Sequence, residues 1–125
     1  MELKYRELEN GIRLIKLIGE LDINGVKDVE SNFIVHCAGS RVKLIVDLSE
    51  LDFLAPVGSQ LILWTVKEVV SRGGRLVLFS PISTVEQTLK QIGIIEWAII
   101  HSDIDAATSF LLDKDESRIP NPRPG

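Results

Sequence analysis

The chain has 125 residues, of which 45% are hydrophobic and 26% are charged, so it can bury a core without disulfides or metal ions. Its formal net charge is −4, and its 14 basic residues form no cluster along the sequence, which argues against a nucleic-acid partner. Cys37 is the one cysteine, which excludes an internal disulfide. The polar N-terminus does not resemble a signal peptide, and no apolar run is as long as a membrane span. We therefore expect a cytoplasmic protein with no membrane partner.

Predicted strands and helices alternate along most of the chain. A turn at residues 9–11 joins a first strand to a second strand at 12–18. Apolar runs predict further strands at 42–48, 75–79 and 97–100. Apolar residues at helical spacing predict helices at 26–37, 57–72, 83–91 and from 102 to about 112. This order predicts an α/β fold with a mostly parallel four- to five-stranded sheet, an N-terminal antiparallel hairpin and about four helices.

Several residues are expected to serve the fold at the ends of these elements. Ser83 and Glu86 form a capping-box pattern, and Ser102 is expected to cap the last helix. The pair Gly73-Gly74 is expected to end the helix at 57–72. Acidic residues gather near one strand end, where turn and capping roles are expected rather than a cation site: Asp47, Glu50 and Asp52. Trp97 is expected to pack in the core.

The domain is expected to span residues 1–112. Residues 113–125 are charged and then rich in proline, which is typical of a flexible tail. A proline-rich recognition segment at 118–124 is the alternative interpretation of this stretch.

The residues that could carry catalysis are not arranged for it. The sequence has no phosphate-binding glycine loop. His36 and Cys37 are adjacent, so on a helix they point about 100° apart, and nothing nearby has metal-ligand spacing. His101, Ser102 and Asp103 are immediate neighbours and cannot converge on one substrate atom. We therefore predict no enzymatic activity, no cofactor and no metal.

Three motifs occur in a characteristic order. They are Gly19-Glu20-Leu21-Asp22, the stretch 46–54 (VDLSELDFL) followed by Gly58, and the stretch 72–78 (RGGRLVL). Together they resemble the STAS domain, the fold of bacterial anti-sigma factor antagonists, and the resemblance covers about residues 3 to 112. It implies a regulatory binding protein whose partner is an anti-sigma factor that is also a serine kinase, of the ATP-binding histidine-kinase-like type.

The sequence departs from that family at its phosphorylation site. The family has Asp-Ser-Ser-Gly at the start of the second helix, and the second serine is phosphorylated. Here Ala55-Pro56-Val57-Gly58 occupies these positions, so Val57 stands where the phosphoserine would be and has no hydroxyl group. Ala55 replaces the capping aspartate, a loss of about 1 kcal/mol. Pro56 partly compensates because proline suits the first turn of a helix.

Ser59 is a candidate substitute for the missing phosphorylated serine. It lies close to the face of the helix that carries Gly58, Ile62, Val66 and Val69, which we expect to be the core face, so packing is the expected role of Ser59. On the outer face, Val57 and Trp64 point in nearly the same direction, with Leu61 at the edge. An exposed apolar stripe with a tryptophan favours a contact surface. The alternative is that Trp64 lies against a loop or the tail of its own chain.

The predicted partner-binding residues are Asp22, Pro56, Val57, Gly58, Gln60, Leu61 and Trp64. Two other functions stay open. The apolar stripe would equally suit a homodimer or a scaffold in a signalling complex that has no phosphorylation switch. A nucleotide or small-molecule site beyond the strand ends, which some family members have, would fit the fold class but lacks a phosphate loop here.

Overall fold

The computed structural model describes residues 1–113. Its elements, in chain order, are β1 (Glu2–Glu7), β2 (Arg13–Leu21), α1 (Ile23–Cys37), β3 (Lys43–Asp47), β4 (Leu51–Leu54), α2 (Pro56–Ser71), β5 (Arg75–Phe79), α3 (Ser83–Gln91), a short 3-10 helix η1 (Ile94–Glu96), β6 (Ile99–His101) and α4 (Ile104–Leu112). The predicted order of strands and helices is confirmed, with β4 and η1 added. The predicted tail begins at Asp113, and its residues 114–125 lie outside the described part of the chain.

The six strands form one mixed sheet. Its order is β1-β2-β3-β5-β6, and β4 pairs with β2 next to the end of β3. Only β1 and β2 are antiparallel, whereas every other pair is parallel. Strand β2 pairs with β3 through residues 13–16 and with β4 through residues 19–21, and the pairing with β4 shifts register between Gly19 and Glu20. The prediction of four to five strands therefore missed β4, because a four-residue strand with an acidic second residue shows no periodicity.

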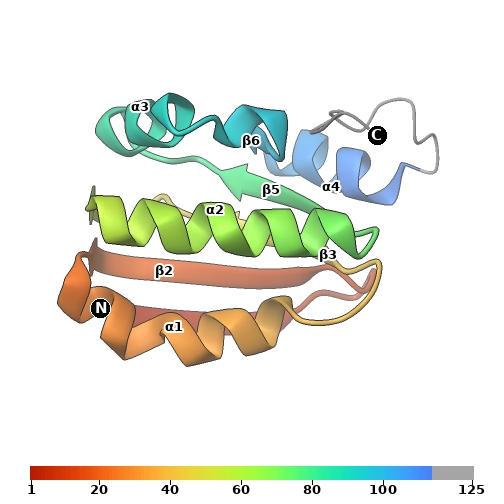
Figure 1. The fold of residues 1–125 in the computed structure, drawn as a ribbon. Coiled ribbons are helices and arrows are strands. Elements are labelled where there is room, and N and C mark those ends of the chain that lie inside the picture. The colour runs from red at the N-terminus through yellow and green to blue at the C-terminus, as the bar shows by residue number, and fades with distance from the viewer. Residues whose placement is uncertain (114–125) are drawn as a thin grey trace.

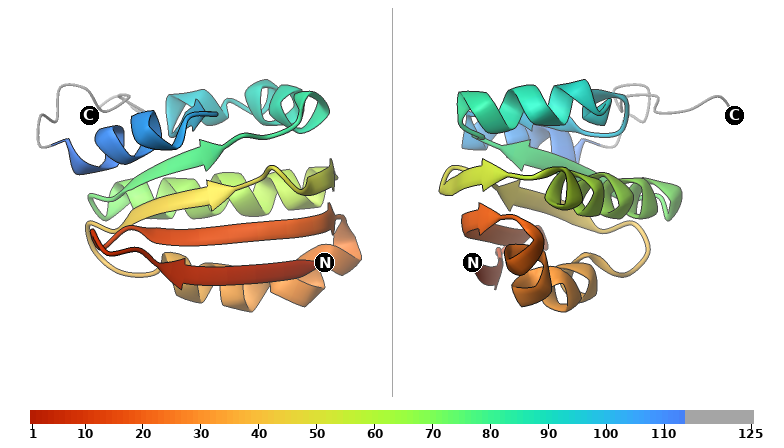
Figure 2. Two further views of the ribbon diagram at one scale, coloured as in Figure 1. Left: turned by 180° about the vertical axis from the view of Figure 1, so that it is seen from behind. Right: turned by 60° about the vertical axis from the view of Figure 1, so that its left-hand side comes forward.

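The sheet separates two cores (Figures 1 and 2). Helices α1, α2 and α3 bury their apolar faces on one side, where Leu44 and Val46 of β3 meet them. Helix α4 covers the other side with Ala107 and Leu111, which pack on Ile45 of β3. Adjacent residues of β3 thus point into opposite cores, as expected for a strand covered on both faces.

Two of the predicted helix caps are wrong. Helix α3 follows Ile82, and no side chain caps it, so the capping box at Ser83 does not form. Helix α4 is capped by Asp103, whose carboxylate accepts hydrogen bonds from the backbone N–H groups of Asp105 and Ala106, rather than by Ser102. Ser83 is the first residue of α3 rather than the residue before it, and Ser102 lies one residue before the N-cap of α4. A cap works only at the residue where the backbone first leaves the helical conformation.

Other structural expectations are confirmed. Helix α2 ends as predicted, with Gly73 in the left-handed region at φ 81° and the N–H of Gly74 donated to the carbonyl of Val69. The His36 ring stacks on Tyr5 with centroids 4.0 Å apart, and Cys37 is buried. Trp97 is partly buried against the larger core, and the ammonium of Lys67 lies 5.1 Å from its ring centroid.

Candidate partner-binding surface

The predicted site residues lie at the start of α1 and along α2 from its start to Trp64, and both helices begin at the carboxyl edge of the parallel strands. Asp22 caps α1, and its Oδ1 accepts a hydrogen bond of 2.8 Å from the N–H of Gly25. The start of α2 lies next to it, because the N–H of Ala55 donates to the carbonyl of Leu21 at 3.1 Å. Asp22 therefore has a structural role in α1, and it also stands beside the start of α2.

Helix α2 begins without a side-chain cap. Ala55 occupies the N-cap with an extended backbone and makes no capping hydrogen bond, while Pro56 is the first helical residue. The first helical bond runs from the N–H of Ser59 to the carbonyl of Ala55 at 2.9 Å. This confirms the predicted loss of the capping aspartate and the predicted position of Pro56.

Two of the candidate residues face inward. A Cβ atom at Gly58 would lie 2.4 Å from the carbonyl oxygen of Leu21, so α2 can sit this close to β2 only with glycine there. Ser59 is 2% exposed, and its hydroxyl donates to the carbonyl of Pro56 at 2.9 Å. A kinase could reach Ser59 only if the first turn of α2 opened, so the structure favours the packing role expected for it.

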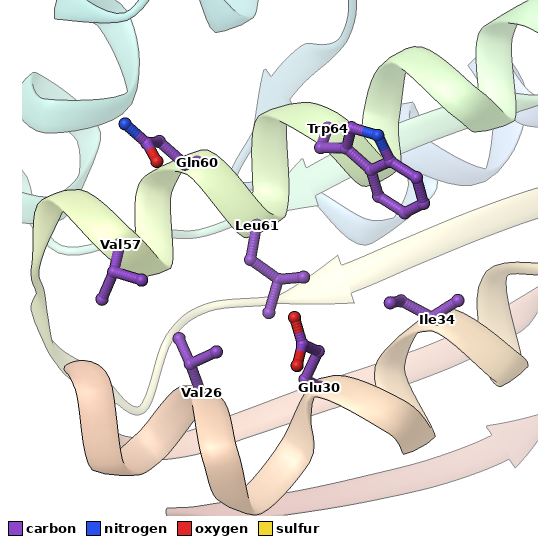
Figure 3. A pocket seen from close by; sticks show the side chains of 7 residues that line it. All are labelled: Val26, Glu30, Ile34, Val57, Gln60, Leu61 and Trp64. Carbon is purple, nitrogen blue, oxygen red and sulfur yellow. The ribbon is translucent and has the colours of Figure 1, made fainter.

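A groove of about 330 Å³ runs between α1 and α2, and the side chains of both helices line it (Figure 3). From α2, Val57 is 37% exposed and Trp64 is 51% exposed, whereas Leu61 is only 8% exposed. Figure 3 shows Leu61 pointing from α2 towards α1, with Gln60 pointing away from α1. Leu61 therefore forms the floor of the groove rather than part of an outer stripe, and Val57 and Trp64 are the exposed apolar residues of the predicted surface.

The second wall of this groove was not predicted. It consists of Val26, Glu30 and Ile34 on α1. The signal in the sequence is the spacing of four residues between them, which places all three along one line of a helix. The apolar spacing predicted a helix that begins at Val26, but the spacing within one helix does not show that α1 lies against α2.

Exposed apolar side chains also gather at the carboxyl edge itself. This edge is where each parallel strand gives way to the next helix, and large exposed hydrophobic residues lie along it: Phe53 within β4, and Ile23, Val57, Ile82 and Ile104 at or next to helix starts. Exposed acidic residues from the same edge include Glu20 and Asp52. The edge next to the groove therefore combines apolar and acidic groups, which suits contact with another protein.

Of the acidic residues near this strand end, Asp47 has the turn role that was expected, whereas Glu50 forms an ion pair. The Asp47 carboxylate accepts from the N–H of Ser49 at 2.9 Å. Glu50 forms an ion pair with Lys16, and this hydrogen bond raises the pKa of the Lys16 ammonium above its usual value.

The described residues offer little for catalysis. Within residues 1–113, no three His, Cys, Asp or Glu side chains are grouped so that they could hold a metal ion. Burial raises the pKa of the Cys37 thiol to about 12, so this thiol is not a nucleophile at neutral pH. None of the helices in the described part of the chain is both long and apolar enough to cross a membrane.

Comparison with known proteins identifies the fold. The family model for the STAS domain matches residues 6–107. An anti-sigma-factor antagonist (STAS) domain protein from Planctomyces limnophilus has a similar structure, with a TM-score of 0.77 and 18% identity over 87% of this chain and 96% of that one. No curated protein matches the sequence.

Two further solved structures share the fold. The anti-sigma factor antagonist SpoIIAA of Bacillus, in its unphosphorylated form, has a TM-score of 0.69 and 21% identity over 87% of this chain and 95% of its own. An anti-sigma factor antagonist from Mycobacterium paratuberculosis has a TM-score of 0.66 and 17% identity over 90% of this chain and 94% of its own. Because the family model spans most of the chain and the architecture agrees with it, this protein is a member of the STAS domain family.

Proposed function

We propose that this protein is a regulatory binding module of the anti-sigma factor antagonist type, and that it binds an anti-sigma factor through the start of α2 and the groove beside it. The observation that carries the proposal is the exposure of Val57 and Trp64 on a groove beside α2, the helix at whose start the family has its phosphorylated serine. Three proteins of the same fold are described as antagonists of this kind.

The partner contact combines apolar anchors with a polar rim. Trp64 and Val57 supply the anchors, and Leu61 closes the floor of the groove. Gln60 and Pro56 are exposed beside them, and Asp22 adds a carboxylate at the neighbouring helix start. Buried aromatic anchors surrounded by polar groups dominate the affinity of most protein interfaces. The family resemblance points to a kinase-like partner that binds ATP.

In this proposal the protein has no phosphorylation switch. Val57 has no hydroxyl group to accept a phosphate, and the hydroxyl of Ser59 is buried and hydrogen-bonded. Binding is then governed by the amounts of the protein and its partner rather than by modification of α2. The module acts by occupying a partner surface and catalyses no reaction.

Affinity capture from native cytosol tests the surface. The wild-type chain is compared with Trp64→Asp and with Ile95→Asp, a matched control because Ile95 is 53% exposed and lies far along the chain in η1. Mass spectrometry identifies the bound proteins and any phosphopeptide that contains Ser59. We expect an ATP-binding, kinase-like anti-sigma factor with the wild type and with Ile95→Asp, and none with Trp64→Asp. Equal capture by Trp64→Asp would reject this surface, and a phosphate on Ser59 would restore the switch.

The second candidate function is a homodimer or scaffold that uses the same surface. The observation in its favour is the half-exposed Trp64, which would be covered equally well by the groove of a second copy. Analytical ultracentrifugation separates the two. A monomer over a wide concentration range favours the antagonist, whereas a dimer that Trp64→Asp dissociates favours the scaffold.

A further inference from the structure

A second pocket lies at the opposite end of the sheet from the start of α2. It has a volume of about 440 Å³ and is lined by Arg41, Val42, Lys43, Gly73, Arg75, Leu112 and Asp113. These residues come from the amino ends of β3 and β5, the turn after α2 and the end of α4. Helix α2 extends between the two sites, which therefore do not overlap (Figure 1). The inference below is independent of the proposed function.

Most of the cations at this end have partners that explain their presence. Helices α1, α2 and α4 end here, and their last carbonyl groups carry partial negative charge. Arg13 donates to the carbonyls of His36 and Ala38 at 3.0 and 2.6 Å. Arg72 forms an ion pair with Glu68 at 2.9 Å. The side chains of these two arginines are therefore already engaged at the ends of α1 and α2.

Arg75 is also held by a helix end, and this fixes it at the pocket. Its guanidinium donates to the carbonyl of Phe110 at 2.9 Å and to the carbonyl of Asp113. The same guanidinium lines the pocket. Arg75 therefore presents a positive charge whose position is set before any ligand arrives.

Arg41 and Lys43 are different, because neither side chain has a hydrogen bond or ion pair with another residue in the range 1–113. Arg41 is also held in the left-handed region at φ 56°, with its N–H donated to the carbonyl of Arg72 at 2.9 Å. A side chain other than glycine in that conformation costs about 1 kcal/mol. The helix ends account for neither cation, so both remain available to a ligand.

The charge of this pocket is opposite to that of the whole chain. Three cations and one carboxylate, Asp113, line it, whereas the net charge of the protein is −4. The volume falls in the range of small-ligand pockets. A concave site with an excess of positive charge concentrates the electric field and attracts a compact anion.

We propose that this pocket binds a small soluble anion that carries phosphate groups. Arginine guanidinium groups match the geometry of phosphate oxygens, and a lysine ammonium supplies a further point charge. Arg75 provides the fixed donor, while Arg41 and Lys43 close on the phosphate from the β3 side. Val42 and Leu112 supply an apolar wall for the organic part of such a ligand.

Titration of the full 125-residue chain with inorganic pyrophosphate, followed by two-dimensional NMR of the backbone amides, tests this proposal. We expect saturable shifts at Arg41, Lys43 and Gly73, and none at the start of α2. Lys43→Gln should weaken binding about tenfold, the loss expected for one charge-assisted contact. Lys27→Gln is the matched control, because it removes the same charge from an exposed position near the start of α1 and should leave the affinity unchanged.

Three results would overturn the proposal. One is a set of shifts that do not saturate, and another is an equal loss of affinity in Lys43→Gln and Lys27→Gln, because both would indicate general charge screening. The third concerns the source of the phosphate. Sedimentation of the chain with phosphatidylcholine vesicles that contain phosphatidic acid, combined with no response to pyrophosphate, would assign the cations to a lipid surface instead.

Discussion

The starts of α1 and α2 lie side by side at the same edge of the sheet, and they are alike in one respect and different in another. Each helix has a glycine three residues after its N-cap, Gly25 in α1 and Gly58 in α2. A Cβ atom at these positions would lie 2.1 Å from the carbonyl oxygen of Glu20 and 2.4 Å from that of Leu21, respectively. The caps differ, because Asp22 caps α1 whereas Ala55 makes no capping bond.

This difference separates what the fold requires from what it tolerates. The close approach of each helix to β2 leaves no room for a side chain, so both glycines are required by packing. Without a cap, the first backbone N–H groups of an exposed helix end bond to water instead, and the loss of stability is about 1 kcal/mol. The domain keeps α2 in place through the buried face of that helix and through Pro56 at its first position. The fold therefore tolerates Ala55 at the exposed start of α2.

Replacing either glycine should have the largest effect. Gly58→Ala and Gly25→Ala should each lower the free energy of unfolding by about 3 kcal/mol or more, because the new methyl group meets a backbone carbonyl that cannot move aside. Urea denaturation followed by circular dichroism measures this. Ser31→Ala, at an exposed position of α1, is the control and should change stability little. A neutral Gly58→Ala would show that α2 can shift away from β2.

Removing the cap of α1 should have a smaller effect. Asp22→Ala should lower the free energy of unfolding by about 1 kcal/mol, because the N–H of Gly25 loses its carboxylate partner. The same denaturation experiment measures it, and Asp22→Asn, which retains a capping oxygen, should recover most of the loss. Equal losses in both variants would mean that charge, rather than the cap, is what matters at this position.

Adding a cap to α2 should act in the opposite direction. Ala55→Asp should raise the free energy of unfolding by up to about 1 kcal/mol, because a carboxylate there can accept from free N–H groups and also favours the positive end of the helix dipole. The gain should shrink in high salt if the dipole contributes. No gain at all would indicate that Pro56 holds the backbone in a geometry that a capping side chain cannot reach.

The smallest effect is expected next to the most sensitive glycine. Val57→Ser should change the free energy of unfolding by no more than about 0.5 kcal/mol, because Val57 is partly exposed and has no packing role as tight as that of Gly58. Differential scanning calorimetry of Val57→Ser and Gly58→Ala, run in parallel, compares their losses of stability directly. A loss as large as that of Gly58→Ala would mean that Val57 belongs to the core and would weaken its assignment to a binding surface.

Much of the fold was predictable because it depends on local patterns. The helix at 83–91 and the strand at 75–79 have the predicted bounds, since their apolar spacing and flanking turn residues are strong signals. The bounds of α1 were less accurate, because Ile23 is exposed and the Asn24 and Gly25 that follow it add no periodic apolar signal. The caps of α3 and α4 were mispredicted because each serine lies one residue from the actual N-cap, and periodicity does not locate a helix end to a single residue.

The candidate site was predicted on one side only. Val57 and Trp64 could be placed on the outer face of α2 because helical geometry relates residues of one helix. Leu61 was misplaced, since its burial is produced by α1 and not by α2. The wall formed by Val26, Glu30 and Ile34 required knowledge of how two helices pack, which the period of a single helix does not contain.

The sequence by itself determined the local chemistry of this protein. It excludes a hydroxyl at residue 57, a cap from residue 55 and an internal disulfide, because these depend only on which residues are present. The tertiary structure alone decided which distant residues meet. Arg13, Arg41, Lys43, Arg72 and Arg75 form no cluster along the chain, yet they gather at one end of the sheet because parallel strands start at the same edge while the helices between them end there. The groove at the other site exists for the same reason, since α1 and α2 are neighbours only after β2, β3 and β4 have paired.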